Sequence, residues 1–355
     1  MDGSTVVSAV EVEAAPARCD VPSAVRTLAC VVTYEPDRAH LTDLLVDLQA
    51  VPGLDIVLID NSEGPTGCAE VSAVASAFNV RSICNSSNRG VGEAHNQAID
   101  LARARGCQRL LLLDQDSSLS GAAVQQLDDS LSTLLAAGIN VAAVGPRFVD
   151  PRTGEQGPFV RLGRGLRMRH IDFGESDRHV ECDLLISSGC LMPISVFDAV
   201  GRLDGGLFIE YVDVEWCVRA RAHGYKLFGI PSAEMLHTIG ESSVRRFGRR
   251  WPLHSPYRQY YLVRNALLFA RKHYLPLRWR LHLLTRAMAQ FVLYAGFCTP
   301  RWQRARWMLL GAWHGLLGRD GRLGGPDGLG WHAAAHPERH SPHVPAELEP
   351  GVSQG

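Results

Sequence analysis

Strand-like and helix-like segments alternate along the first third of the chain. The strand-like segments cover 28–33, 55–60, 79–84 and 109–114, and helical patterns lie between them at 38–50, 68–78 and 90–105. Near-continuous apolar runs are typical of buried parallel strands, whereas apolar residues at helical spacing, such as Leu41, Leu44 and Leu48, mark one face of a helix. Strands separated by helices of this length predict βαβ units. We therefore predict an α/β fold with a mostly parallel central sheet.

The rest of the chain divides into a mixed middle and a helical end. Between about 140 and 250, strand-like runs at 141–145, 183–188 and 225–230 are separated by turns rich in Gly and Pro. Helical patterns then follow near 256–274, 277–298 and 300–317, and two of them start at Pro256 and Pro300, the residue type favoured at a first helical position. We expect a disordered leader over 1–25 and a disordered tail over 319–355, because these segments lack apolar periodicity.

The charge distribution shows a contrast that the net charge hides. The formal net charge of the 355 residues is only -1, from 36 basic and 37 acidic residues. Between Ser242 and Arg319, however, there are 15 basic residues and no Asp or Glu, which leaves 21 basic and 37 acidic residues elsewhere. Such asymmetry often marks a partner surface. The hydrophobic fraction of 46% excludes a chain that is disordered throughout.

Cysteine usage and hydropathy predict a cytoplasmic protein. The nine cysteines are odd in number and form no CxxC pair, which favours reduced thiols over a disulfide framework or a zinc site. The acidic N-terminus has no apolar core typical of a signal peptide. The closest candidate for a membrane span, 281–298, contains His282, Arg286 and Gln290, so we predict no transmembrane helix.

Asp114-Gln115-Asp116 follows a strand of four leucines and is the most informative local motif. Two carboxylates one residue apart at a strand end can face a single Mg²⁺ or Mn²⁺, which prefers oxygen ligands and bridges to phosphates. Such a cation offsets the charge that develops on a diphosphate leaving group. The alternative is two solvated acids in a loop.

Polar residues also follow two other predicted strands. Asp60 could accept hydrogen bonds from a nucleotide, since parallel strand ends face the ligand crevice, or it could close an Asx turn. After Asn88, Gly90 and Gly92 permit close approach of the backbone to phosphate at a helix N-terminus. A dinucleotide site is disfavoured because His95 stands where the third glycine of such a turn belongs.

A second acidic group, Asp213 and Glu215, alternates with apolar residues. One or both could point into a cleft, where an apolar wall raises a carboxyl pKa and suits a general base. The alternative is a cluster of acids at a helix N-terminus. His237 is a plausible further metal ligand, although a lone histidine is usually structural.

Taken together, these segments resemble the GT-A glycosyltransferases of family 2, especially bacterial rhamnosyltransferases that use dTDP-rhamnose. The matching segments occur in the family's order at 31–36, 59–62, 88–96, 112–117, 188–191, 208–216 and 235–240. The resemblance covers about 28–270. It implies a GT-A fold with a nucleotide-sugar-binding half over 26–138 and an acceptor-binding half over 139–254, followed by a basic amphipathic helical segment over 255–318.

The resemblance also implies a role for each matching residue. Donor binding falls to Thr33, Tyr34, Asp60, Asn88, Gly90 and Asp114, metal binding to Asp116 and His237, proton abstraction to Asp213, and the acceptor and sugar pocket to Ser188, Gly189, Glu215 and Trp216. The chain departs from the family pattern at Gly92, His95 and Ala98, where Ala, Gln and Gly are common. Related galactofuranosyltransferases often carry paired Asp residues where this chain has Val212-Asp213.

The implied activity is inverting transfer of rhamnose from dTDP-rhamnose, dependent on a divalent cation, Mg²⁺ or Mn²⁺. The acceptor would be a saccharide, often lipid-linked in this family, in cell-surface polysaccharide synthesis. One alternative is another family 2 transfer, of galactofuranose or glucose. Another is a catalytically silent subunit that binds a glycan or sugar nucleotide, against which the retention of Asp114, Asp116, Asp213 and His237 argues.

The basic helical end adds a candidate partner. Its arginines lie among Leu, Phe, Tyr and Trp, a combination that suits contact with an anionic cytoplasmic leaflet and predicts a peripheral membrane protein. The helices could instead pack on the catalytic domain with solvated arginines, or form the interface of a homo-oligomer. No recognised nucleic-acid motif accompanies the charge, so a nucleic-acid partner is not expected.

Overall fold

A computed structural model describes residues 25–324, apart from 152–153, 164–167, 175, 238–241 and 247–248. The predicted leader, except for Val25, and the tail beyond 324 lie outside the described residues. Residues 319–324 do have a defined position, so the predicted disorder of the tail is wrong for these six residues.

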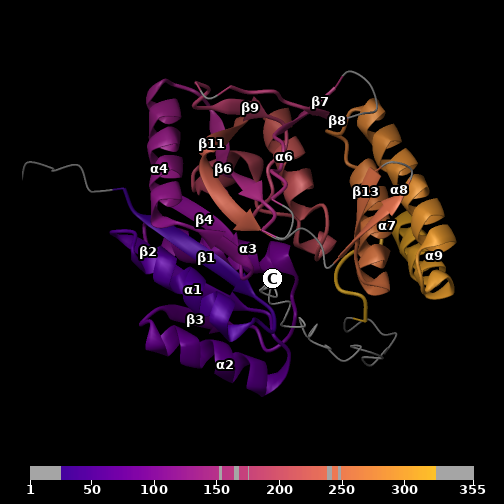
Figure 1. Cartoon of the computed structure of the whole chain (residues 1–355), viewed down its shortest axis with the longest axis horizontal. Coiled ribbons are helices and arrows are strands. Elements are labelled where there is room, and N and C mark those ends of the chain that lie inside the picture. Colours follow the sequence, from indigo (N-terminus) through magenta and orange to yellow (C-terminus); the bar gives the residue numbers. More distant parts are fainter. Residues whose placement is uncertain are drawn as a thin grey trace, which may run out of the picture.

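One mixed sheet runs through the part of the molecule that precedes the basic helical segment (Figure 1). Its main path has the order β3-β2-β1-β4-β10-β6-β11-β5, and β9 pairs with β11. The strands are β1 Thr27–Thr33, β2 Leu54–Asp60, β3 Arg81–Cys84, β4 Arg109–Asp114, β5 Ser117–Leu119, β6 Val141–Val149, β9 Val180–Cys182, β10 Leu191–Pro193 and β11 Lys226–His237. The β1–β2, β1–β4, β2–β3 and β6–β11 pairs are parallel, which confirms the predicted mostly parallel sheet.

Helices cover both faces of this sheet, because alternate residues of each strand point to opposite faces. Leu28 and Cys30 of β1 belong to one buried cluster, and Ala29 and Val31 belong to the other. The helices of this part are α1 Arg38–Gln49, α2 Gly64–Ala77, α3 Val91–Ala104, α4 Gly121–Ala136, α5 Val196–Val200, the 3₁₀ turn η1 Gly205–Leu207, and α6 Val212–Ala222. The first cluster packs under α3, α5 and α6, and the second under α1, α2 and α4.

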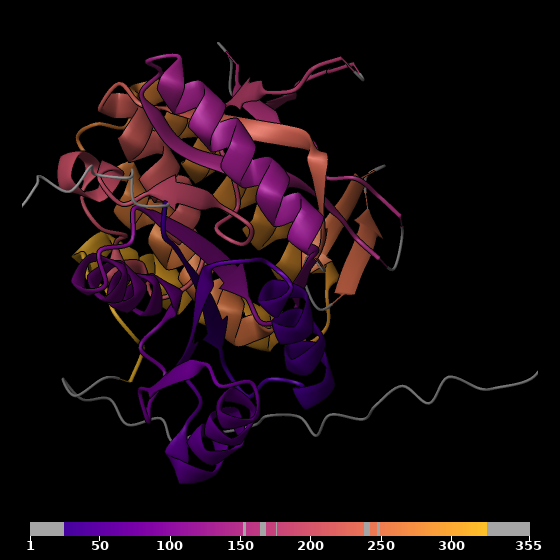
Figure 2. The ribbon, with the colours of Figure 1, turned by 90° about the vertical axis from the view of Figure 1, so that its left-hand side faces the viewer.

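The basic segment is helical, as predicted, and lies to one side of the sheet (Figures 1 and 2). It contains α7 Pro256–Ala270, α8 Leu277–Phe297 and α9 Arg301–Leu317. Ser255 caps α7 by accepting a hydrogen bond from the Arg258 backbone. Helix α9 approaches α7 closely at Gly311, where an added Cβ would lie 2.4 Å from the carbonyl oxygen of Tyr260.

Two short antiparallel hairpins were not predicted. They are β7 Val160–Leu162 with β8 Met168–His170, and β12 Ser242–Arg246 with β13 Arg249–Leu253. The predicted strand at 183–188 is wrong: β9 ends at Cys182 and β10 begins only at Leu191. The interval is a turn in which Gly189 has a φ of +81°, a conformation that interrupts a strand.

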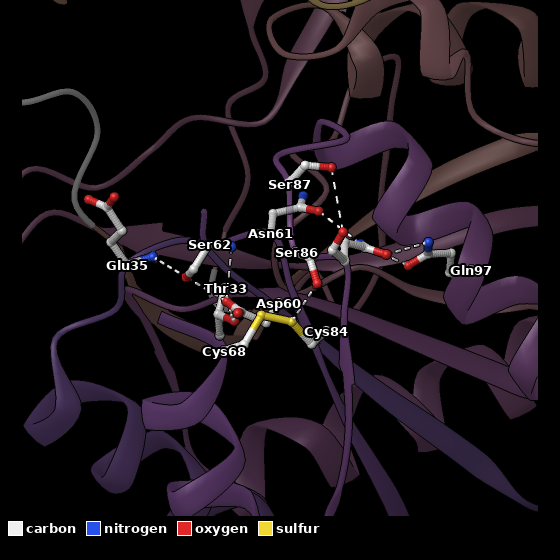
Figure 3. Close-up of a disulfide and its surroundings, with 11 residues drawn as sticks. Thr33, Glu35, Asp60, Asn61, Ser62, Cys68, Cys84, Ser86, Ser87 and Gln97 are labelled. Atoms are coloured by element: carbon white, nitrogen blue, oxygen red, sulfur yellow. Dashed lines mark hydrogen bonds between the residues drawn. A yellow bond between two sulfur atoms is a disulfide. The ribbon is translucent and has the colours of Figure 1, made fainter. Parts of the chain in front are cut away.

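The prediction that the cysteines are reduced is wrong for two of them. Cys68 on α2 and Cys84 at the end of β3 form a disulfide, with their Cα atoms 5.7 Å apart (Figure 3). The other cysteines of the described chain are free and buried: Cys30, Cys107, Cys182, Cys190, Cys217 and Cys298. Helix α2 leads directly into edge strand β3, and the fold brings the two sulfur atoms together across a separation of 16 residues.

Candidate functional site

The polar residues that follow β1, β2 and β4 meet at one edge of the sheet. Strand pairing sets Thr33 beside Asp60 and Val32 beside Asp114. Because parallel strands end at the same edge, the residues predicted to bind a ligand are brought together there. The structure thus assembles one candidate site from segments such as those of Tyr34 and Gln115, which are 81 residues apart in sequence.

Asp60 is held in a buried hydrogen-bond network (Figure 3). Its Oδ1 accepts hydrogen bonds from the hydroxyls of Thr33 and Ser62, at 2.8 Å and 2.7 Å. The Ser62 hydroxyl in turn accepts from the backbone of Glu35 at 2.7 Å. Among the described residues, Asp60 Oδ2 has no hydrogen-bond partner. A buried acceptor of this kind normally has a partner, so Asp60 retains capacity for a donor that the described residues do not supply.

Gln115 belongs to the framework of the candidate site, a position that sequence reasoning missed. Its side-chain amide makes two hydrogen bonds with the backbone of Tyr34, accepting from the nitrogen at 2.6 Å and donating to the oxygen at 3.1 Å. This pair of bonds fixes the turn between Asp114 and Asp116 to the end of β1. The middle residue of an Asp-x-Asp motif carries no sequence signal for such a contact, because the partner is a backbone group.

Asp114, Asp116 and His237 form a group suited to a divalent cation. One ligand atom from each lies within 4.8 Å of the others. The antiparallel pairing of β5 with β11 sets His237 beside Ser117, whose hydroxyl lies 3.0 Å from His237 Nδ1. The pKa of Asp114 is raised to about 6, chiefly because the carboxyl is buried. Asp116 and Asp213 also raise this pKa, whereas His237 lowers it. Two carboxylates and an imidazole are ligands that Mn²⁺ and Mg²⁺ accept, and a cation would relieve the repulsion between the acids.

Ser188 and Gly189 support this acidic turn from beneath. The Ser188 hydroxyl accepts a hydrogen bond from the Asp114 backbone at 3.0 Å and lies 2.6 Å from the Ser117 hydroxyl. At Gly189, an added Cβ would lie 2.5 Å from the Pro146 ring. Both residues therefore belong to the site's framework, and Ser188 is almost completely buried.

Asp213 lies in the first turn of α6, the helix N-terminus that one of the two alternatives predicts. Asp213 also lines a small cavity with Ser187 and Cys190, so the two alternatives are compatible at this residue. Its Oδ1 accepts a hydrogen bond from the Val214 backbone at 2.7 Å. Burial raises the pKa of Asp213, and the nearby Glu210 raises it further. Asp213 is also one of the charges that act on Asp114, which places it within electrostatic reach of the Asp114–Asp116 turn.

Comparison with known proteins finds relatives of this chain in sequence and in fold. No family model matches the chain. Over 249 residues it is 32% identical to the dTDP-rhamnosyl transferase RfbF of Shigella flexneri, a match that covers 70% of this chain and 81% of that protein. The chain belongs to the rhamnosyltransferase family of GT-A glycosyltransferases. Its fold matches that of S. aureus TarS 1–349, solved in complex with UDP-GlcNAc, with a TM-score of 0.52 at 13% identity over 83% of this chain and 82% of TarS 1–349.

In this glycosyltransferase, Glu215 and Trp216 lie in the core and not in the predicted acceptor pocket. Glu215 is 1% exposed, forms two hydrogen bonds with Arg219 at 2.8 Å and 2.9 Å, and accepts a third from Tyr274. The Trp216 indole donates to the Gly201 carbonyl at 3.0 Å and packs on Phe197. Helical geometry turns these residues inward, whereas the resemblance to the family implied that they shape the acceptor and sugar pocket.

A protein contact requires a glycine at position 90 of the glycosyltransferase, and the predicted approach to phosphate stays a prediction. Gly90 has a φ of +86°, and an added Cβ would lie 2.5 Å from the Phe208 carbonyl oxygen. Its backbone nitrogen donates to Asn88 Oδ1 at 2.9 Å, and its carbonyl accepts from Asn61 Nδ2 at 3.2 Å. Asn88 and Gly90 therefore shape the loop that enters α3.

We predict that Gly90→Ala destabilises the glycosyltransferase by more than about 3 kcal/mol, because a strained backbone conformation and a clash add together. Gly138→Ala is the matched control: Gly138 also has a positive φ of +74°, but nothing lies within 4 Å of an added Cβ. That control should cost only about 1 kcal/mol. Urea unfolding of both variants measures the difference, and equal losses would contradict the close packing at Phe208.

Proposed function

We propose that this glycosyltransferase moves rhamnose from dTDP-rhamnose to a saccharide acceptor in cell-surface polysaccharide synthesis. The observation that carries the proposal is the convergence of Asp60, the Asp114–Asp116 turn, His237 and Asp213 at one sheet edge. Asp60 offers an acceptor for a nucleotide, the turn and His237 offer a cation site, and Asp213 offers a base. The similarity to a protein named a dTDP-rhamnosyl transferase supports the choice of donor.

Asp116 and His237 would hold Mg²⁺ or Mn²⁺, with Asp114 facing the sugar nucleotide. When bound, the cation offsets the negative charge that develops on the leaving dTDP. Thr33, Tyr34 and Asp60 would hold the base and ribose. The Gln115 amide contributes by fixing the acidic turn relative to Tyr34, so that the two ends of the nucleotide are held at a constant separation.

Asp213 would act as the general base in a single inverting displacement. The acceptor hydroxyl forms a bond to the anomeric carbon, its proton passes to the Asp213 carboxylate, and the bond to the dTDP oxygen breaks. A pKa raised by burial makes Asp213 a better proton acceptor than a solvated carboxylate. Its place beside Asp114 would set it near the sugar that is transferred.

The acceptor is proposed to be lipid-linked, and the enzyme to act at the cytoplasmic face of the membrane. Helix α8 exposes a stripe of apolar residues on one face, and α9 adds Trp302, which is 80% exposed. The α8 stripe consists of Leu277, Leu281, Leu284, Met288 and Val292. Helices α8 and α9 contain no acidic residue. Exposed apolar side chains on helices that carry arginines and no acids suit the interface of an anionic bilayer. Within the described chain, no helix is long and apolar enough to cross a membrane.

The donor assignment is tested by incubating the enzyme and a divalent cation with dTDP-rhamnose, UDP-galactofuranose or UDP-glucose, and measuring release of the nucleoside diphosphate. We expect turnover with dTDP-rhamnose that chelation by EDTA abolishes. Preference for a UDP-sugar would replace rhamnose with galactofuranose or glucose. Cation-dependent binding without turnover would indicate a silent sugar-nucleotide-binding subunit.

We predict that Asp213→Asn lowers kcat by about 10²- to 10⁴-fold, because the amide cannot accept the proton. The affinity for dTDP, measured by calorimetry, should change less than twofold, since the base acts on the acceptor. Asp198→Asn, which alters an exposed carboxylate on α5, is the control and should keep wild-type kcat. Full activity of the Asp213 variant would exclude Asp213 as the base.

We predict that the double variant Met288→Glu and Val292→Glu no longer floats with liposomes that contain phosphatidylglycerol. Buried apolar surface and attraction between arginines and anionic lipid drive such binding, and two glutamates remove both effects on α8. Val46→Glu changes an equally exposed apolar residue on α1 and should float like the wild type. Equal flotation of all three proteins would contradict membrane contact through α8.

A further inference from the structure

A strap formed by residues 319–324 returns from α9 to the catalytic part of the molecule. Helix α9 ends at Gly318, whose φ of +74° turns the chain back on itself. The Gly321 nitrogen then donates to the Gly206 carbonyl at 2.6 Å, and the Leu323 nitrogen donates to the Tyr261 hydroxyl at 3.0 Å. The strap is therefore hydrogen-bonded through its backbone to η1 and to α7.

A buried arginine secures the strap from below. Arg264 on α7 is 1% exposed and lies over the Tyr261 ring, 4.7 Å from its centroid. It donates hydrogen bonds to the carbonyls of Leu207, at 2.9 Å, and of Gly321. The buried Arg264 guanidinium has several hydrogen-bond partners in fixed positions, so it holds the strap backbone at Gly321 in a defined place. The side chain of the following residue, Arg322, therefore projects from a fixed point.

That next side chain, Arg322, reaches the two loops that form the nucleotide end of the site. It makes an ion pair with Glu63, and its Nη1 lies 3.5 Å from the Asn88 carbonyl. Glu63 directly follows Asp60-Asn61-Ser62 at the end of β2, and Asn88 leads into α3. A buried hydrogen bond from the Asn61 side chain to the Gly90 carbonyl joins the same two loops.

The electrostatic environment of Tyr34 indicates that Arg322 of the strap lies close to the candidate site. Burial raises the pKa of Tyr34, and Glu63, Arg322 and Tyr257 also act on it electrostatically. Tyr257, on the first turn of α7, also contacts Tyr261, the residue that anchors the strap. Side chains from the loop after β2, from α7 and from the strap therefore lie within electrostatic reach of Tyr34, at the end of β1.

We infer that the strap completes the donor site and that Arg322 is a positioning residue, which holds the loops after β2 and before α3 in the arrangement that binds a pyrimidine nucleoside diphosphate. This inference rests on the proposed function in one respect, namely that this edge of the sheet is the donor site. An exposed ion pair such as Arg322–Glu63 contributes little free energy by itself. Here, however, the hydrogen-bonded backbone of the strap already restricts the conformational freedom of Arg322. Arg322 should therefore influence nucleotide affinity through the loops rather than the chemical step.

The test is calorimetry of the full chain with dTDP and Mg²⁺, combined with steady-state kinetics. We expect Arg322→Ala to raise the Kd for dTDP and the KM for the donor by about two- to fivefold, the range of an exposed pair, with kcat little changed. Glu63→Ala should have the same effect, and the double variant no larger one, because both changes remove one interaction. Arg322→Lys should recover part of the affinity. Arg319→Ala, which removes a charge from the same strap, is the matched control and should bind dTDP like the wild type.

Several results would overturn the inference. Wild-type affinity in Arg322→Ala, or additive losses in the double variant, would show that the pair does not position the loops. If Arg322→Ala fails to fold, Glu63→Ala measures the same pair from the opposite side, and wild-type affinity in that variant has the same meaning. A wild-type enzyme that binds no nucleoside diphosphate would instead remove the donor site itself, which separates failure of the proposed function from failure of the strap.

Discussion

The parallel pairing of β1 with β2 and β4 is the constraint on which the whole site depends. It sets Thr33 beside Asp60 and Val32 beside Asp114, so three chain segments deliver their polar residues to one edge. The Gln115 amide then locks the acidic turn to Tyr34, and Ser188 supports it from below. A shift of one residue in this register would point the carboxylates to the other face of the sheet. The buried apolar runs therefore determine the geometry of the chemistry as well as the stability of the core.

The acidic residues at this edge of the sheet require nearby positive charge. Asp114, Asp116 and Asp213 repel one another, and burial adds to the effect by raising the pKa of Asp114 and Asp213. His237 offsets part of the repulsion, and a divalent cation would offset the rest. The same crowding suits the proposed reaction, which needs one carboxylate with increased proton affinity beside a cation-bound diphosphate. Positive charge also reaches this edge, because Arg258 on α7 lowers the pKa of Asp114.

The sequence predicted the elements whose signal is local. Apolar runs located the strands on which the site is built, and periodicity and helix-starting prolines located the three C-terminal helices. The family motifs pointed to Asp60, Asp116 and His237 before their proximity was known. Contacts between distant segments could not be predicted in the same way. Three such contacts are the Cys68–Cys84 disulfide, the hydrogen bonds between Gln115 and Tyr34, and the ion pair between Arg322 and Glu63. Each joins chain segments that become neighbours only when the protein folds.

Other errors arose where one pattern fits two structures. Alternating acids and apolar residues over 212–216 suggested residues facing a cleft, but the segment is the start of α6, so Glu215 and Trp216 point into the core. Gly90 matched a phosphate-binding glycine, yet its conformation and the nearby Phe208 carbonyl explain why a glycine stands there. In both cases a packing requirement and a functional motif select the same residue type, and only the three-dimensional contacts distinguish them.

The most direct test of the account is a crystal structure of the enzyme with Mn²⁺ and dTDP. The account predicts that the anomalous signal of manganese lies between Asp116 and His237, that the diphosphate contacts the ion, and that the thymine and ribose lie against Thr33, Tyr34 and Asp60. Manganese bound away from these residues, or dTDP seated elsewhere without contact to Asp60, would contradict the claim that the parallel strand ends form the donor site.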